Sequence, residues 1–395
     1  MSKLDELIVE LCPNGVEFFK IKDICYVSRG VVISKQDIIE NFGEFPVYSS
    51  QTENNGELGK INTYAYDGEY LTWTTDGANA GTVFYRIGKF NVTNVCGILK
   101  LTKQDTLMRY IYHILRVEAP KYVRSGMGNP KLMSNVMGDI IIPIPPLPIQ
   151  QEIVRILDTF TELTAELTAE LTARKKQYEY YRDKLLTFEE GEVEWKTLGE
   201  IGKFTYGYAA KAQESGEARF VRITDINERG KLITEDKKYI DISKENERYI
   251  LKKNDLLMAR TGATYGKTMI FEEDYLAIYA GFLIKISFSE KLINPRYYWH
   301  FSQSKLFWAQ ANKLVSGGGQ PQFNANALKE VKFPIPYSNN FDKSLAEQER
   351  IVAILDKFDA LTNSISEGLP REIELRQQQY EYYRNMLLNF PKQED

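Results

Sequence analysis

The segment from Gly262 to Thr268, GATYGKT, is the part of the sequence that comes nearest to a catalytic motif. It looks like a phosphate-binding loop, in which backbone amides and a lysine hold the phosphates of a nucleotide. That loop needs four residues between its two glycines, whereas three residues separate Gly262 from Gly266. The matching segment in the first half of the chain, GANAGTV, contains no basic residue. We therefore expect no nucleotide to bind here.

Two other features imitate enzymes without completing a motif. The stretch 129–132, NPKL, begins like the Asn-Pro-Pro-aromatic signature of adenine methyltransferases and then departs from it. No glycine-rich cofactor loop follows a predicted strand. The two histidines, His113 and His300, lie in aromatic-rich apolar helical stretches, for which structural roles are the expectation. The sequence therefore predicts no catalytic residue and no bound cofactor.

The cysteines indicate a reducing compartment. Cys12, Cys25 and Cys96 are odd in number and far apart, which does not suit a disulfide framework. They form no cluster with the histidines at metal-ligand spacing, so we expect no metal site. The N-terminus has no signal-peptide pattern, and no apolar run approaches the roughly 18 residues of a membrane span. We expect a cytoplasmic protein without a membrane segment.

The composition sets the scale of the protein. Its 395 residues are enough for two domains, and 43% hydrophobic with 26% charged residues is ordinary for a globular protein. The net charge of −4 does not suit a protein that coats nucleic acid through bulk positive charge. Any nucleic-acid site must therefore be local.

The stretch 150–188 predicts one long helix that needs a helical partner. Apolar residues recur in alternating steps of four and three, which is the pattern of a coiled-coil seam. At 1.5 Å per residue such a helix spans about 60 Å. The predicted seam consists of Ile153, Leu157, Phe160, Thr164, Leu167, Leu171, Arg174, Tyr178, Tyr181, Leu185 and Phe188.

The partner lies in the same chain. QxxIVxILDxF at 150–160 recurs at 348–358, and QYEYYRxxLLxF at 177–188 recurs at 379–390, with four additional residues between the two matches. The added residues fall near Gly368 and Pro370, where we expect the second helix to kink. Its predicted seam consists of Ile351, Leu355, Phe358, Thr362, Ile365, Leu369, Ile373, Arg376, Tyr380, Tyr383, Leu387 and Phe390.

The repeat extends over the whole chain. GEYLTWTTDGANAGTVFY at 68–85 is similar to KNDLLMARTGATYGKTMIF at 253–271, and IIIPIP at 140–145 is similar to VKFPIP at 331–336. Short runs rich in β-branched and aromatic residues, separated by Gly, Asn, Asp and Ser, predict strands, with helical stretches between them. We expect an α+β protein in four segments: a globular domain at 1–148, a long helix at 149–190, a second globular domain at 191–343 and a second long helix at 344–391.

With the duplicated domain, the entry IPxPPLPIQQEIVRILD and the exit QYEYYRDKLL in view, the sequence resembles the specificity subunit of a type I restriction–modification system. The resemblance covers nearly the whole chain and is most specific in the helical segments. It implies two similar α/β target-recognition domains joined by two long antiparallel coiled-coil helices with pseudo-twofold symmetry. It also implies a non-catalytic reader of double-stranded DNA, with a bipartite, asymmetric site of fixed spacing. The implied partners are two modification (adenine methyltransferase) subunits and two restriction subunits.

Base reading requires hydrogen-bonding side chains on loops that reach the edges of base pairs in the major groove. The alternative for each such residue is a solvated turn. In the first half of the chain the candidates are Ser49, Ser50, Gln51, Asn54, Asn55, Thr74, Thr75, Asn79, Arg124, Asn129 and Lys131. In the second half they are Arg222, Thr224, Asp225, Arg260, Thr261, Tyr265, Lys267, Gln320, Gln322 and Asn324.

A tandem four-residue unit, TELTAELTAELTA at 161–173, is a candidate for the element that sets the DNA spacer. One unit more or less changes the helix length by about 6 Å and its rotation by about 40°. The simpler interpretation is an Ala- and Leu-rich helical run. A second function also remains open, that of a coiled-coil scaffold which binds proteins and no DNA.

Overall fold

The computed structural model describes residues 3–125, 128–189, 191, 193–233, 235–317, 319–364 and 366–393. The chain folds into two compact units, one formed by Met1–Glu166 with Glu374–Asp395 and the other by Leu167–Ile373. Each unit contains one globular part and a portion of both long helical segments. The two units are therefore interleaved along the sequence.

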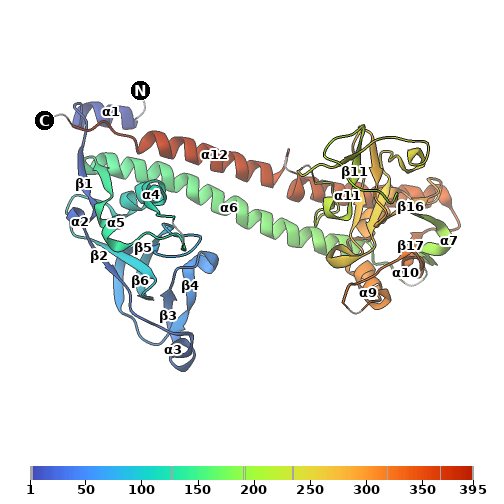
Figure 1. The fold of residues 1–395 in the computed structure, drawn as a ribbon, viewed down its shortest axis with the longest axis horizontal. Coiled ribbons are helices and arrows are strands. Elements are labelled where there is room, and N and C mark those ends of the chain that lie inside the picture. The colour runs from blue at the N-terminus through green and yellow to red at the C-terminus, as the bar shows by residue number, and fades with distance from the viewer. Residues whose placement is uncertain are drawn as a thin grey trace. The chain divides into compact units, whose positions relative to one another are not determined.

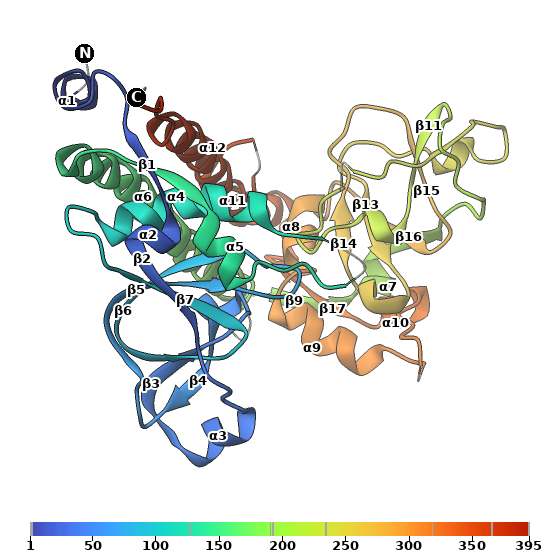
Figure 2. The same ribbon diagram turned by 60° about the vertical axis from the view of Figure 1, so that its left-hand side comes forward.

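The first unit is built on a six-stranded sheet in the order β2-β7-β5-β6-β3-β4 (Figures 1 and 2). Neighbouring strands are antiparallel except β3 and β6, which run parallel with Val47 opposite Asn91. A separate antiparallel pair joins β1 (Glu17–Lys20) to β8 (Ile141–Ile144). The sheet strands are β2 (Cys25–Arg29), β3 (Phe42–Tyr48), β4 (Glu57–Ile61), β5 (Tyr66–Thr74), β6 (Val83–Val92) and β7 (Cys96–Leu101).

The sheet of the first unit packs against α4 because both carry continuous apolar faces. Leu71 and Trp73 of β5, with Leu99 of β7, share one buried core with Ile111 and Leu115 of α4. The spacing of these α4 residues places them on one side of a helix. The helices of this globular part are α1 (Lys3–Leu11), α2 (Ile21–Ile24), α3 (Lys35–Glu40), α4 (Met108–Glu118) and α5 (Ser134–Asp139), with 3-10 turns at η1 (Glu53–Gly56) and η2 (Ala119–Tyr122).

The second unit repeats this plan with a divided sheet. Four antiparallel strands have the order β10-β16-β13-β14, and three further strands have the order β12-β11-β15, with β11 parallel to β15. β9 pairs with β17 as β1 pairs with β8. The strands are β9 (Val193–Thr197), β10 (Gly202–Tyr206), β11 (Ala218–Val221), β12 (Tyr239–Ile240), β13 (Leu256–Ala259), β14 (Thr268–Ile270), β15 (Ala277–Tyr279), β16 (Leu283–Phe288) and β17 (Lys332–Pro336).

The strands of the two units follow the same order. In the first unit the long strand β6 pairs with both β5 and β3. In the second unit β14 pairs with β13, and a separate strand, β15, pairs with β11. The predicted α+β class with two similar globular domains is thus confirmed. The remaining elements of the second globular part are α7 (Leu198–Ile201), α8 (Pro295–Phe301), α9 (Lys305–Leu314), α10 (Ala325–Lys329), η3 (Ile223–Asp225), η4 (Glu247–Tyr249) and η5 (Gly262–Thr264).

The first long helix is continuous, as the seam pattern predicts. α6 runs from Leu147 to Leu185 without interruption. It begins in the first unit and ends in the second. The second helical segment differs from the single kinked helix that the sequence predicts, because it consists of α11 (Phe341–Asn363) and α12 (Leu369–Leu387).

The break between α11 and α12 has a local cause in the backbone. Gly368 adopts φ +82°, and a Cβ atom there would lie 2.5 Å from the carbonyl oxygen of Ala360. Only glycine tolerates this conformation without strain. Pro370 follows in the first turn of α12, where its missing N–H costs no helical hydrogen bond. Ile365 of the predicted seam lies outside the described residues.

Within each unit the two helical segments contact each other through aromatic rings. In the first unit, Phe160 of α6 stacks on Tyr383 of α12 with ring centroids 5.4 Å apart. In the second unit, Tyr181 of α6 stacks on Phe358 of α11 at 5.5 Å. The predicted seam residues Ile153, Leu157, Tyr178, Ile351, Leu355 and Tyr380 are buried, and Phe160, Leu167, Leu171, Tyr181, Phe358 and Tyr383 are partly buried.

Among the described residues, no helix combines the length and the apolar composition that crossing a lipid bilayer requires.

Candidate nucleic-acid interface

Two of the predicted loops in the first unit are hydrogen-bonded to each other. The loop that follows β5 receives the hairpin 124–131: the amide of Gly77 donates to the carbonyl of Pro130 at 3.0 Å, and the amide of Leu132 donates to the carbonyl of Thr75 at 2.9 Å. Arg124 and Lys131 close the hairpin through two backbone hydrogen bonds of 3.0 and 3.1 Å. Residues far apart in sequence thus form one loop platform.

The third predicted loop of this unit, 49–55, joins the same platform. The amide of Thr75 lies 3.3 Å from the hydroxyl of Ser50, and the side-chain amide of Asn79 donates to the hydroxyl of Thr52 at 3.0 Å. Ser49 accepts a hydrogen bond from Thr93 at 3.0 Å. All three loops that the sequence singles out in the first half therefore converge.

Some of the candidate residues on this platform are buried, and others are exposed to solvent. Thr74 and Thr75 are buried, and the Thr75 hydroxyl lies 2.7 Å from the carbonyl oxygen of Val95 while Thr74 donates to the carbonyl of Asn79. Ser50 and Gln51 likewise donate to backbone carbonyls of this loop region. These side chains hold the loops in place. The candidates that face solvent are Asn54, Asn55, Asn79, Arg124, Asn129 and Lys131.

Arg86 supports the exposed asparagines, and the sequence did not single it out. Asn54 and Asn55 both adopt left-handed backbone conformations, with φ of 47° and 54°. The buried guanidinium of Arg86 lies 3.5 Å from the ring centroid of Tyr48 and donates to the carbonyl of Asn55 at 2.8 Å. Burial lowers the pKa of Arg86. The one available signal was an arginine within a strand, β6, that is rich in apolar and aromatic residues.

The second unit contains the equivalent loop pair. The amide of Gly262 donates to the carbonyl of Pro321 at 3.1 Å, and the amide of Phe323 donates to the carbonyl of Arg260 at 2.8 Å. Backbone bonds of 3.0 and 2.7 Å between Ser316 and Gln322 close the hairpin. The backbone hydrogen bonds match those of the first unit, although the side chains on the loops differ.

Several candidates of the second unit are engaged in holding local structure. Thr261 is buried and accepts a hydrogen bond from the side chain of Gln322 at 2.8 Å. Asn324 caps α10 through bonds from two backbone amides. Tyr265 donates to Asn312 of α9 at 3.2 Å. Thr224 and Gln320 are exposed on their loops.

Arg222 and Asp225 form a closed ion pair. The Arg222 guanidinium contacts the two carboxylate oxygens of the buried Asp225 at 2.7 and 3.2 Å and reaches Asp236 at 3.2 Å. Hydrogen bonds to Asp225 raise the pKa of Arg222. The guanidinium is therefore occupied by protein carboxylates, in contrast to that of Arg260, whose Nε donates to the carbonyl of Gly281 at 3.3 Å.

Each globular part contacts the long helical segments through a histidine. In the first unit, Nε2 of His113 lies 2.8 Å from Asp158 of α6, and its Nδ1 lies 3.5 Å from the hydroxyl of Tyr380 of α12. Arg109, one turn before His113 on α4, donates to the same carboxylate at 2.9 Å. A side chain of the globular part thus contacts both helical segments.

The second unit has the same arrangement. Nε2 of His300 lies 2.8 Å from Asp356 of α11, and its Nδ1 lies 3.1 Å from the hydroxyl of Tyr178 of α6. Arg296 donates to Asp356 at 3.1 Å. We call each set of a tyrosine, a histidine, an aspartate and an arginine a histidine junction. In the first unit α12 contributes the tyrosine, and in the second unit α6 does.

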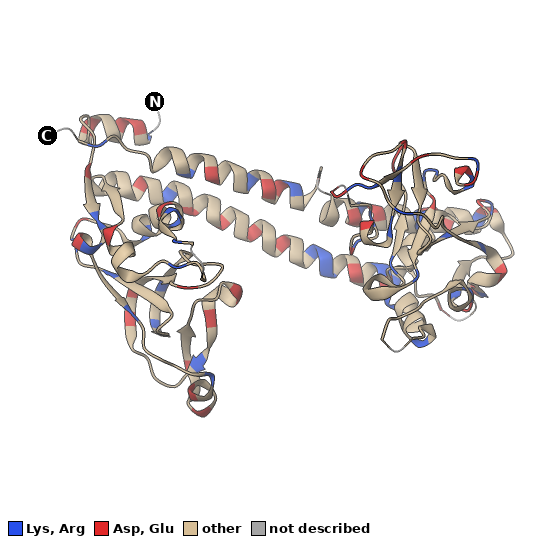
Figure 3. Cartoon of the chain, viewed as in Figure 1, with Lys and Arg blue, Asp and Glu red and all other residues tan. Residues whose placement is uncertain are grey.

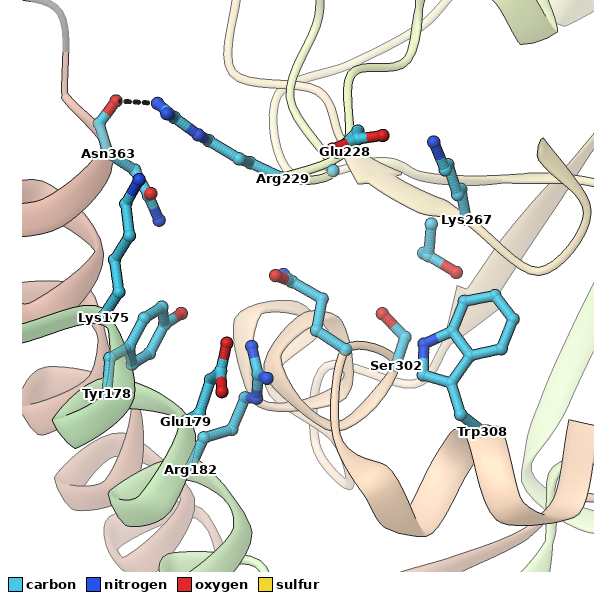
Figure 4. Close-up of a pocket in the computed structure, with 13 residues that line it drawn as sticks. Lys175, Tyr178, Glu179, Arg182, Glu228, Arg229, Lys267, Ser302, Trp308 and Asn363 are labelled. Carbon is cyan, nitrogen blue, oxygen red and sulfur yellow. Dashed lines mark hydrogen bonds between the residues drawn. The ribbon is translucent and has the colours of Figure 1, made fainter. Parts of the chain in front are cut away.

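A cavity of about 420 Å³ lies within the second unit, between the last turns of α6 and the loops beside α8 and α9 (Figure 4). Ser302 in its wall donates its hydroxyl to the carbonyl of Trp299 at 2.7 Å, so this oxygen is committed to α8. The predicted candidate Lys267 lines the cavity. Its charged lining residues are Lys175, Glu179, Arg182, Glu228, Arg229 and Lys267.

Lys and Arg are interspersed with Asp and Glu along the elements of both units (Figure 3). In the described part of the chain, no group of three or more His, Cys, Asp and Glu side chains is placed to hold a metal ion. The three cysteines, Cys12, Cys25 and Cys96, are unpaired and buried.

Comparison with known proteins identifies one family. The model of the type I restriction modification DNA specificity domain matches residues 13–174 and again residues 190–375. A putative type I specificity subunit of Mycoplasma pneumoniae is 33% identical over 377 residues, which cover 95% of this chain and 98% of that protein. The specificity subunit of the type I restriction enzymes EcoR124I and EcoR124II of Escherichia coli is 39% identical over 73% of this chain and 72% of its own length.

A solved structure has the same fold. The crystal structure of a type I restriction-modification system S subunit from M. genitalium superposes with a TM-score of 0.59, covering 95% of this chain and 96% of that chain at 15% identity.

Proposed function

Because the chain belongs to the family of type I restriction-modification DNA specificity subunits, we propose that it reads a bipartite, asymmetric site in double-stranded DNA. Each loop platform reads one half-site, and the bound complex directs methylation of adenine by partner subunits. The observation that carries the proposal is the pair of equivalent platforms. Their backbone hydrogen bonds match, from Gly77 to Pro130 and from Gly262 to Pro321, while their exposed side chains differ.

The different side chains support two different half-sites. Phosphate contacts position a protein on DNA, whereas base-edge contacts specify the sequence. Asparagines dominate the exposed part of the first platform, at Asn54, Asn55, Asn79 and Asn129, and Asn is suited to adenine. The second platform instead presents Arg260. Two readers with unlike chemistry select unlike sequences, so the complete site is asymmetric.

The proposal assigns catalysis to other chains. This subunit contributes recognition, two modification subunits contribute methyl transfer, and two restriction subunits join in the full complex. The complex acts in the cytoplasm, where the three reduced, buried cysteines of this chain are stable. The net charge of −4 is consistent with a reader that depends on partner subunits for part of its attraction to DNA.

The spacer between the half-sites is set by helix length in this proposal. Residues 161–173 lie inside the continuous helix α6, so each added or removed unit translates and rotates one end of the helix relative to the other. Since the two globular parts are attached to different portions of α6, the length of this block determines which spacer they accept together.

Mapping of methylated adenines tests the proposed function. Host DNA from cells with and without this chain is compared, with its modification subunit present in both. A split motif that appears only with the chain supports the proposal and reveals both half-sites and the spacer. An unchanged methylation pattern, together with no binding to random-sequence duplexes in the presence of the modification subunit, would instead favour a protein-binding scaffold.

A further inference from the structure

Arg260 lies over two exposed aromatic rings. Its guanidinium carbon is 5.3 Å from the ring centroid of Tyr206 and 5.1 Å from that of Phe282. The two rings are 43% and 55% exposed. Together with the arginine they form a solvent-facing surface on which a cation is held by aromatic rings.

The surrounding backbone fixes this arginine. The amide of Arg260 donates to the carbonyl of Phe282 at 3.1 Å, and its Nε donates to the carbonyl of Gly281 at 3.3 Å. Its own carbonyl accepts the amide of Phe323 at 2.8 Å, at the base of the hairpin 316–322. The flanking ring of Tyr206 is held in turn, because its hydroxyl accepts the amide of Ala325 at 3.2 Å.

The outer edge of the guanidinium is left open by these contacts. Among the described residues, neither Nη atom of Arg260 has a hydrogen-bond or ion-pair partner, whereas Arg222 binds two carboxylates and Arg296 binds another two. The Nη atoms carry N–H groups in a planar fork that matches two adjacent acceptors. The fork is therefore free to bind an acceptor from outside the chain.

We propose that Arg260 reads a guanine of the second half-site through paired hydrogen bonds to its O6 and N7 atoms, and that Tyr206 and Phe282 are the residues that position it. This inference rests on the proposed function and adds the base and the residues responsible. Guanine presents two adjacent acceptors in the major groove, and arginine is the side chain best matched to them. The rings restrict the side chain before binding, so less conformational entropy is lost when the contact forms.

The place of Arg260 in the fold favours a base contact, although a guanidinium fork can pair with a phosphate as well as with a base edge. Arg260 belongs to the loop that the repeat places opposite the hairpin, where the candidate base-reading residues gather. The corresponding position of the first half of the chain is Thr75, which is buried and whose hydroxyl lies 2.7 Å from the carbonyl oxygen of Val95. The guanine contact is therefore specific to the second half-site.

The test uses the full chain with its modification subunit on duplexes randomised within the mapped site. The variant Arg260→Lys keeps the positive charge and loses the fork. We expect the preference for guanine at one position of the second half-site to fall by about 5- to 150-fold, since a bidentate contact contributes roughly 1–3 kcal/mol of discrimination. Preferences in the first half-site act as the internal control for folding and assembly.

The rings are tested with two matched variants. Tyr206→Leu removes the ring, and we expect it to weaken the same guanine preference while the other positions stay unchanged. Tyr206→Phe keeps the ring and loses only the hydrogen bond with Ala325, so it should retain the preference. Arg222→Lys, at the arginine already bound to Asp225 and Asp236, serves as the control and should leave every base preference unaltered.

Two outcomes would overturn the inference while the proposed function stands. In one, Arg260→Lys leaves every position of the motif unchanged; if Arg260→Ala then weakens methylation equally on all sequences, the contact is to a phosphate. In the other, Arg260→Lys itself weakens methylation equally on all sequences. If the unmodified chain returns no motif at all, the proposed function itself fails.

Discussion

His113 and His300 are each enclosed between a carboxylate and a tyrosine, and this arrangement determines their protonation. The Nε2 proton of a neutral imidazole can be donated to Asp158 or Asp356, and Nδ1 can accept from Tyr380 or Tyr178. Burial lowers the pKa of both histidines more than the neighbouring carboxylates raise it. Both rings are therefore neutral near pH 7, and each junction has a single satisfied hydrogen-bond pattern.

Acid should weaken both histidine junctions. An unfolded histidine takes up a proton as the pH falls below about 6.5, whereas the folded histidines do so only at lower pH. The unfolding free energy that the neutral histidines contribute is therefore fully present above about pH 6.5 and is lost as the pH falls below it. We expect up to about 1.4 kcal/mol of lost unfolding free energy per histidine at pH 5.5. Thermal unfolding at pH 7.5 and 5.5 measures this.

The matched control for the junctions is the double variant His113→Gln, His300→Gln. It should be less stable than the natural chain at pH 7.5 and should show a flatter dependence on pH between 7.5 and 5.5. The aspartates add a second loss only in stronger acid. Burial raises the pKa of Asp158, but the bonds from His113 and Arg109 outweigh it and lower the pKa overall. Equal pH slopes for the two proteins would contradict this account.

Sequence reasoning located the loops but not the direction of each side chain. The repeat placed Thr75 and Thr261 in equivalent loops, yet both are buried and bond to the platform, because a loop must first satisfy its own polar groups. Arg86, Tyr206 and Phe282 lie outside those loops in sequence. Their roles depend on contacts between strands and loops far apart in the chain, and the sequence contains no local signal for such contacts.

At the scale of elements, the seam pattern predicted α6 well because a heptad is a local property that persists over many turns. The same pattern did not distinguish a kinked helix from two helices at Gly368. A glycine and a proline close together allow either outcome, and the positive φ of Gly368 directly precedes the first residue of α12. The helix was thus predictable and its break was not.

Gly368→Ala tests the role of that break. Alanine disfavours φ +82°, and its Cβ would lie 2.5 Å from the carbonyl oxygen of Ala360. We expect a loss of about 1–3 kcal/mol in the free energy of unfolding, measured by urea titration. Gly191→Ala is the matched control, since Gly191 has φ +92° and the Cβ of an alanine there would have no heavy atom within 4 Å. It should cost less, and an equal loss for both would show that the close contact is unimportant.

Deletion of Thr168–Leu171 tests whether α6 measures the DNA spacer. The helix remains in phase to within about 40° and becomes about 6 Å shorter, so both platforms should still fold and read their half-sites. We expect the methylated motif to keep both half-sites and to lose base pairs from the spacer between them. The control Thr168→Ala, Glu170→Ala alters exposed residues without changing the length and should keep the spacer. An unchanged spacer after deletion would refute the measuring role.

At the scale of the whole molecule, the chain consists of two units that interleave along the sequence. Each unit combines one globular part with portions of both helical segments, and the two histidine junctions take their tyrosines from α12 and α6 respectively. The sequence repeat predicted the duplication. It did not predict the interleaving. Tyr178 follows the first globular domain in sequence but contacts His300 of the second unit, and Tyr380 follows the second globular domain but contacts His113 of the first unit.

Separate hydrophobic cores predict independent reading of the two half-sites. Leu71, Trp73 and Leu99 belong to a core of the first unit, whereas Leu256 and Trp299 belong to a core of the second. Substitutions without shared partners usually add in free energy within about 0.5 kcal/mol. A substitution on one platform should therefore leave the selectivity of the other unchanged, even though one continuous helix serves both.

A double-mutant cycle tests this independence. Asn54→Gly with Asn55→Gly removes two exposed side chains and tolerates their left-handed backbone, with φ of 47° and 54°. We expect it to reduce discrimination in the first half-site, by about 1–3 kcal/mol for each lost base contact, and Arg260→Lys to do so in the second. For each variant we compare methylation of matched duplexes with methylation of mismatched duplexes as a ratio. The factor by which the combined variant lowers this ratio should equal the product of the factors for the two separate variants. A combined loss that departs from this product by more than about threefold, beyond the 0.5 kcal/mol of ordinary additivity, would show that binding at one platform alters the other through the helices.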